Sequence, residues 1–142
     1  MPRITIGLPE KYTFTTSIAV RIGDINRGSH ISNVNMLVIV EEARAQFLIS
    51  RGYADEVNHV KDAGFIVGDM GIIYKKQTGY GKPIKVEIGA VDIKNKSFDL
   101  IFKLSDSTGE EIALAKTGML CFDYRTQQVI PIPEEMRRKL EG

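Results

Sequence analysis

The chain has 142 residues, a length that predicts a single domain. Lys and Arg number 19 and Asp and Glu 18, so the net charge is +1, and no basic cluster indicates a protein that binds nucleic acid. One cysteine and two histidines argue against a disulfide framework and against a Cys- or His-rich metal site.

The sequence also argues against a membrane or secreted protein. The first ten residues lack the basic start and the apolar run of a signal peptide. The longest apolar stretch, Met36–Val40, is too short to cross a bilayer. We therefore expect a soluble, cytoplasmic protein.

The first part of the chain predicts a strand, a loop and a long helix. Residues 12–22 are rich in Thr, Ile and Val, which is typical of a strand. Gly, Asp, Asn and Ser concentrate in residues 23–32, which predicts a loop. Residues 33–51 are predicted as a helix that ends before Gly52. Its first half is apolar on nearly every side, so we expect it to be buried all round.

The second part predicts an antiparallel meander. After a polar linker over residues 53–63, short turns separate four strand-like stretches at 64–76, 83–94, 96–105 and 110–124. The tail from Pro131 to Leu140 is predicted as a short, exposed terminal helix. This order predicts an α+β domain in which a curled antiparallel five-stranded sheet wraps around one long central helix.

The loop and the predicted helix carry the most informative motif. Residues 20–33 read VRIGDINRGSHISN, and the helix continues with the segment Glu41–Arg44, EEAR. This set resembles the hotdog-fold thioesterases of the 4-hydroxybenzoyl-CoA thioesterase type. These proteins show an Arg-aromatic-x-Asp-x-Asp loop, a turn similar to Gly-His-Val-Asn-Asn, and Glu-Glu-Ala-Arg in the helix. Similar motifs follow at 64–67, 81–86, 96–98 and 130–133.

The resemblance implies a fold and an activity. It implies one hotdog domain over residues 1–142 and an acyl-CoA thioesterase that hydrolyses a thioester to free acid and CoA. It implies no metal and no cofactor apart from the CoA of the substrate. It also implies a homodimer or homotetramer, because one hotdog unit of this length does not contain a complete site.

The start of the predicted helix is the candidate oxyanion site. A helix N-terminus carries unpaired N–H groups and a partial positive charge. The amide of Asn33, with that of Ser32 or Val34, is placed to bind the thioester carbonyl oxygen. The alternative is that the side chain of Ser32 or Asn33 caps these amides.

Hydrolysis also requires a base or nucleophile. In the resembled family, a carboxylate at the second acidic position of the loop supplies it, and Asn26 stands there in this chain. A neutral amide cannot act as a general base, although it can hydrogen-bond water or the thioester. Asp24, at the first acidic position, is either a catalytic acid or a structural loop residue. Asn26 also motivates an alternative function, a non-catalytic module that binds acyl-CoA or an acyl carrier.

Two helix residues, Glu41 and Glu42, are further candidates for the catalytic carboxylate. Another hotdog branch places its acid inside the central helix, facing the site of the partner chain. Glu41 lies two helical turns after Asn33. The competing interpretation is an ion pair between Glu41 and Arg44.

Four residues are candidates for substrate binding in addition to Ser32. His30 stands at the Gly-His position of the family, with Ser29 in place of the Gly, and contacts either the loop or the substrate. Lys94 and Lys96 flank Asn95 at a predicted hairpin and resemble a basic stretch that holds the CoA phosphates. A solvated turn is the alternative.

Overall fold

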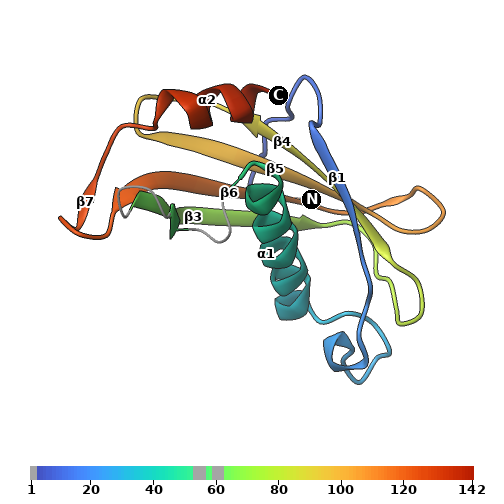
Figure 1. Ribbon diagram of the computed structural model, residues 1–142. Coiled ribbons are helices and arrows are strands. Elements are labelled where there is room, and N and C mark those ends of the chain that lie inside the picture. The colour runs from blue at the N-terminus through green and yellow to red at the C-terminus, as the bar shows by residue number, and fades with distance from the viewer. Residues whose placement is uncertain (1–2, 53–56, 59–62) are drawn as a thin grey trace.

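A computed structural model describes residues 3–52, 57–58 and 63–142, so most of the predicted linker over 53–63 lies outside the described residues. A curved sheet with one long helix against it dominates the structure (Figure 1). The elements are β1 (Phe14–Ile18), the 3-10 helix η1 (Ile22–Asp24), α1 (Asn33–Ser50), β2 (Val57–Asn58), β3 (Ala63–Tyr74), β4 (Ile84–Val91), β5 (Ser97–Ser105), β6 (Glu111–Asp123), β7 (Gln128–Val129) and α2 (Glu134–Glu141).

The described strands form one antiparallel sheet. Their order is β1-β4-β5-β6-β3-β2, and β7 pairs with β6. Turns join β4 to β5 and β5 to β6, as expected for a meander. The predicted α+β fold with five main antiparallel strands around a helix is therefore confirmed, and β2 and β7 add two residues each.

One side of α1 packs on the sheet. The helix begins after Ser32, whose hydroxyl oxygen accepts a hydrogen bond from the Asn35 amide at 3.0 Å. Burial of a large apolar side chain stabilises a protein by about 1.5–3 kcal/mol, so the core rather than helix propensity holds α1. The side chains that α1 gives to this core are at most 3% exposed: Met36, Ile39, Val40, Ala43, Phe47 and Leu48.

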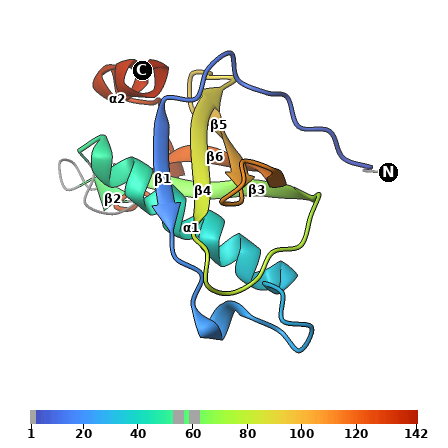
Figure 2. The ribbon, with the colours of Figure 1, turned by 90° about the vertical axis from the view of Figure 1, so that its right-hand side faces the viewer.

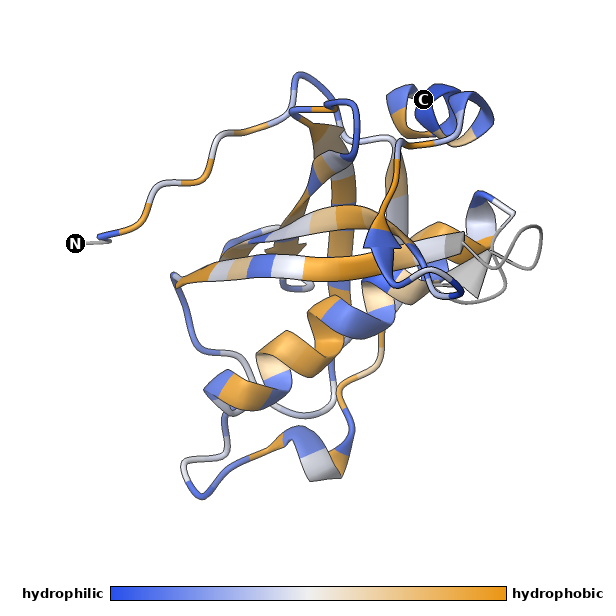
Figure 3. Ribbon diagram, turned by 90° about the vertical axis from the view of Figure 1, so that its left-hand side faces the viewer, coloured by the Kyte–Doolittle hydropathy of each residue, from blue (hydrophilic) through white to orange (hydrophobic). Residues whose placement is uncertain are grey.

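The other side of α1 is open, so the prediction that its first half is buried all round is wrong. Val34 and Val38, in that first half, are 70% and 42% exposed. In Figure 3, hydrophobic colouring covers most of the α1 ribbon. The physical reason is that one sheet covers only one side of a helix, and nothing else in the described structure covers the opposite side of α1.

Among the described residues, β3 has a long edge without a partner strand. One edge of β3 pairs with β6, and the other pairs only at Ala63 and Gly64, with β2. Val67 and Met70 lie on the open stretch and are 39% and 41% exposed. Their partners on β6 are buried residues of the face that meets α1, so both side chains lie on that face. An open apolar edge is a surface on which a further strand can pair.

The N-terminal segment, residues 3–12, lies on the opposite face of the sheet from α1 (Figure 2). A Cβ at Gly71 would lie 3.2 Å from Cδ1 of Ile4, and one at Gly89 would lie 2.9 Å from Cγ of Pro9. The glycines thus let this segment approach the strands. Because both faces are covered, Ile112–Ala115 of β6 are all buried and lack the alternation of a half-exposed strand.

The C-terminal helix α2 is anchored rather than fully exposed, which corrects the prediction for the tail. Met136 and Leu140 are at most 1% exposed. Arg51, at the end of α1, donates from Nε to the Lys139 carbonyl (3.2 Å) and from a terminal nitrogen to the Thr13 carbonyl (3.2 Å). One guanidinium therefore joins α1, α2 and the start of β1. No helix in the described ranges is long and apolar enough to cross a membrane.

Candidate active site

The N-terminus of α1 leaves two backbone amides open. Ser32 accepts the Asn35 amide on its hydroxyl and the Met36 amide on its carbonyl, both at 3.0 Å. No described residue accepts a hydrogen bond from the amides of Asn33 and Val34. These two N–H groups and the partial positive charge of the helix end can bind an oxygen that carries negative charge. Capping by Ser32 and an open anion site are therefore compatible.

A polar hollow of about 440 Å³ lies at this end of α1. The loop before the helix, the helix start, the end of β3 and the connector after it all contribute to its wall. No carboxylate among the described residues belongs to this wall, so the described part of one chain supplies hydrogen-bond donors there but no carboxylate base. The residues that line it are Asn26, Ile31, Asn33, Met36, Tyr74, Lys75, Lys76 and Gln77.

Asn26 closes the loop before α1. Its Oδ1 accepts hydrogen bonds from the backbone amides of Gly28 (3.0 Å) and His30 (3.4 Å). The backbone amide of Asn26 donates to the His30 carbonyl (2.9 Å). Ser29, where the resembled family has glycine, has a φ of 63°, in the left-handed region. Both bonds to the side chain need only an acceptor oxygen, so an aspartate at position 26 can form them too.

Tyr74 is a residue of this hollow that the sequence analysis missed. Its hydroxyl donates a hydrogen bond to the Asn33 carbonyl at 2.8 Å. Burial raises the pKa of Tyr74, so the phenol stays protonated and able to donate at neutral pH. Lys75 and Lys76 follow it, and Lys75 pairs with Glu111 at 2.6 Å. No local pattern marks Tyr74, because it reaches α1 only through the fold, across 41 positions of sequence.

The predicted carboxylates lie around a second hollow. Asp24, Glu41 and Glu42 line a space of about 420 Å³ between β1 and α1. The structure therefore brings Asn26 together with Asn33, and Asp24 together with the two glutamates. It does not bring an acid and the open amides into one hollow of the same chain.

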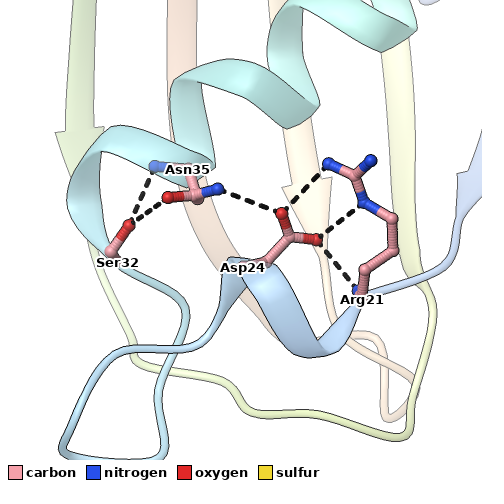
Figure 4. A network of polar contacts seen from close by, with 4 residues as sticks. All are labelled: Arg21, Asp24, Ser32 and Asn35. Atoms are coloured by element: carbon pink, nitrogen blue, oxygen red, sulfur yellow. Dashed lines mark hydrogen bonds and ion pairs between the residues drawn. The ribbon is translucent and has the colours of Figure 1, made fainter.

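Asp24 belongs to a network of polar contacts that ties the loop to α1 (Figure 4). Its side chain is 1% exposed and accepts hydrogen bonds from the Arg21 amide (2.9 Å), the Arg21 guanidinium (3.2 Å) and Nδ2 of Asn35 (3.1 Å). Burial alone raises the pKa of Asp24, but the hydrogen bonds from Arg21 and Asn35 outweigh it and hold the pKa below its ordinary value. This geometry is that of a structural loop acid.

The two helix glutamates are exposed and differ in their contacts. Glu42 accepts a hydrogen bond from Nε2 of Gln46 at 2.8 Å. The Glu41 carboxylate makes no hydrogen bond or ion pair with any residue that the structure describes, so the expected pair with Arg44 does not form. Glu41 is thus a carboxylate on the open side of α1 without a structural partner in the described part of its own chain.

The remaining predicted substrate-binding residues lie at opposite ends of the sheet. His30 is half-buried in the loop beside the polar hollow. Lys94, Asn95 and Lys96 form the turn between β4 and β5, and Arg137 of α2 donates to the Lys94 carbonyl at 2.8 Å. This turn follows the end of β4, whereas the start of α1 lies near the beginning of that strand. Within one chain, the basic turn and the open amides are therefore apart.

No group of three or more His, Cys, Asp or Glu side chains among the described residues is arranged to hold a metal ion. The described residues at the hollow beside α1 that can act chemically are hydrogen-bond donors and two lysines.

A family model described as the thioesterase-like superfamily matches residues 20–140. The chain belongs to this superfamily. A comparison with curated protein sequences finds no match.

Solved structures of similar fold include thioesterases. A hypothetical protein from Staphylococcus aureus in complex with CoA is similar at a TM-score of 0.83 and 16% identity, over 95% of this chain and 85% of that one. A predicted thioesterase from Bacillus stearothermophilus has a TM-score of 0.76 and 25% identity, over 89% of this chain and 92% of that one. A 1,4-dihydroxy-2-naphthoyl-CoA thioesterase from Synechocystis has a TM-score of 0.79 and 17% identity, over 89% of this chain and 94% of that one.

The expected hotdog fold and the thioesterase-like family are thus confirmed. In a thioesterase-like protein, the arrangement at the start of α1 has a clear chemical capability. Two open amides at a helix end can stabilise the negative oxygen that develops when a thioester carbonyl is attacked. Among the described residues, the wall of this hollow includes no carboxylate that could activate a water molecule.

Proposed function

We propose that this protein is an acyl-CoA thioesterase that hydrolyses its substrate to a free acid and CoA. The observation that carries the proposal is the pair of open amides, Asn33 and Val34, beside a polar hollow. The thioester carbonyl oxygen binds these amides, which stabilise the oxyanion of the transition state. Membership of the thioesterase-like superfamily and the CoA in the Staphylococcus aureus structure support this substrate class.

In this proposal, a carboxylate of a second chain activates the water. Glu41 lies on the open side of α1 and makes no contact that a structural role would require. The β3 edge, with Val67 and Met70 exposed, is where a second copy pairs, and its central helix then approaches the hollow. We assign the base to Glu41 of the partner subunit, with Glu42 as the neighbouring candidate.

The same assembly gives the basic turn a role. When two β3 strands pair antiparallel, the end of the partner sheet that carries Lys94, Asn95 and Lys96 lies on the same side as the α1 N-terminus of the first chain. Ammonium groups suit the phosphates of CoA. We propose that the partner's turn meets the coenzyme, while His30 and Ser32 shape the loop around the acyl end.

The first test is turnover of acyl-CoA by the wild-type chain and by Asn33→Pro. Proline is tolerated at the first position of a helix and lacks only the N–H, and Ser32, with ψ of 153°, has the backbone that precedes proline. Thiol release is followed with short, medium and aromatic acyl-CoAs. We expect Asn33→Pro to lower kcat by about 10²–10³-fold.

The matched control is Asn33→Ala, which removes the side chain but keeps the amide. We expect it to retain most of the wild-type kcat. Equal rates for Asn33→Pro and Asn33→Ala would contradict the oxyanion assignment. Absence of turnover with every acyl-CoA at micromolar enzyme would contradict the hydrolase.

One observation favours a second function, a non-catalytic module that binds acyl-CoA. By the resemblance, Asn26 stands where the family has a carboxylate, and no acid among the described residues lines the hollow around it. Tight acyl-CoA binding by calorimetry without turnover is the result that this function requires. Asn26→Asp then separates the two readings, since it restores a base while keeping the loop hydrogen bonds to Gly28 and His30.

A further inference from the structure

The hydrogen bond from Tyr74 to Asn33 acts on one of the two open amides. The accepting carbonyl oxygen belongs to the peptide group that links Asn33 to Val34. The N–H of that same peptide group is the amide of Val34, for which no described residue is an acceptor. The hydroxyl of Tyr74 and a bound oxyanion would thus lie at opposite ends of one peptide group.

A hydrogen bond at the oxygen of a peptide group strengthens its N–H as a donor, because successive hydrogen bonds polarise one another. The bond also fixes the plane of the peptide, and hence the direction of the N–H, before a substrate arrives. Both effects favour the transition state, in which the charge on the oxygen is greatest, over the ground state.

The sheet holds Tyr74 in place for this contact. Tyr74 pairs with Ala113 of β6 as the last residue of β3, and the backbone amides of Lys75 and Lys76 both donate to the Ile112 carbonyl, at 2.9 and 3.2 Å. Tyr74 is 43% exposed and forms part of the wall of the polar hollow. The hydroxyl is thus delivered to α1 from a fixed strand end rather than from a flexible loop.

We propose that Tyr74 is a positioning residue of the oxyanion site, which orients and polarises the Val34 amide through the carbonyl of Asn33. This inference rests on the proposed thioesterase function. It assigns to the end of β3 a part in the reaction that the loop motif and the helix do not reveal.

The test is Tyr74→Phe, which removes one oxygen atom from a partly exposed ring. We expect kcat for acyl-CoA hydrolysis to fall by about tenfold, with KM within about twofold of wild type, because the lost interaction acts in the transition state. Tyr12→Phe is the control, since Tyr12 precedes β1 at the edge of the sheet opposite to β3, and we expect it to keep both constants.

A second measurement reads the amide directly, without turnover. In Tyr74→Phe, the proton resonance of the Val34 amide should move upfield, while those of helix amides beyond Leu37, whose own N–H donates to the Asn33 carbonyl, stay in place. An unchanged kcat, or an unchanged Val34 resonance, would overturn the inference. If the wild-type chain hydrolyses no acyl-CoA, the proposed function fails, and the Val34 resonance alone decides whether Tyr74 polarises this amide.

Discussion

The candidate site residues fall into two groups, the neutral residues beside the open amides and the carboxylates. Asn26, Asn33 and Tyr74 line the hollow at the helix end, and each is neutral. Asp24 lies buried on the other side of the loop, where Arg21 supplies three of the hydrogen bonds that it accepts. A carboxylate that is fully engaged with local donors is poorly suited to take a proton from water. At this scale, Asp24 stabilises the loop that the chemistry needs.

Asp24 therefore gives a prediction about stability and pH. Because the folded-state pKa lies below the ordinary aspartate value of about 4, its stabilisation is present above that pH and is lost as the pH falls through the folded pKa. We expect Asp24→Asn to lower the free energy of unfolding by about 1–3 kcal/mol at pH 7, because it removes a buried charged acceptor. The difference between variant and wild type should shrink in the acid range.

Urea unfolding of both proteins across this pH range measures the effect. Asp92→Asn is the matched control, because Asp92 is exposed and forms no hydrogen bond or ion pair in the described structure. A difference for Asp24→Asn that stays constant from neutral to acid pH would contradict the assignment of the effect to the carboxylate charge.

At the scale of elements, the connector between β3 and β4 supports the loop that carries Asn26. The Ile31 amide donates to the Thr78 carbonyl at 2.9 Å, which joins loop and connector. A Cβ at Gly79 would lie 2.9 Å from the Ser29 carbonyl oxygen, so the two backbones meet more closely than a side chain allows. The loop is therefore shaped from outside as well as by its own turn.

We expect Gly79→Ala to displace this loop. The added methyl group meets a backbone atom that cannot move aside, so the variant should lose about 1–3 kcal/mol of unfolding free energy and several-fold in kcat/KM. Thermal unfolding and acyl-CoA turnover measure the two effects. Gly7→Ala is the control, since a Cβ there meets nothing within 4 Å. Wild-type stability in Gly79→Ala would show that the two segments are not held against each other.

The helices and strands differ in how well they can be predicted from the sequence. The loop residues Asp24 and Asn26 and the helix start can be found from the sequence because their motif is local. The strands can be found because their turns and patterns are local. Tyr74 was missed because its partner Asn33 is distant in sequence, and the burial of α2 because Arg51 contacts it across 88 positions. The apolar start of α1 predicts burial all round, because the local pattern does not show that the sheet covers only one side of the helix.

At the scale of the whole molecule, the separation of acids from open amides predicts a site shared by two chains. We expect Asn33→Pro and Glu41→Gln each to be nearly inactive alone. In Glu41→Gln, loss of the base should lower kcat by about 10²-fold. When the two variants are refolded together, half of the dimers pair one chain of each kind, and each of these contains one intact site. The mixture should recover about a quarter of the wild-type activity.

Acyl-CoA turnover before and after mixing provides the measurement, and each variant refolded alone is the control. A mixture no more active than its components would place both groups in one chain or remove Glu41 from the site. Light scattering on the same samples reports whether the chains associate at all, which the open β3 edge leads us to expect.

The contacts of Arg51 have a consequence for how the molecule opens. Its guanidinium holds the Lys139 carbonyl of α2 and the Thr13 carbonyl before β1, and it lies 4.7 Å from the centre of the Phe47 ring. The last helix and the segment before the first strand thus share one side-chain anchor at the end of α1. We therefore expect the amides of α2 and of the start of β1 to exchange with deuterium through one shared opening, so that the two ends of the chain behave as one cooperative unit.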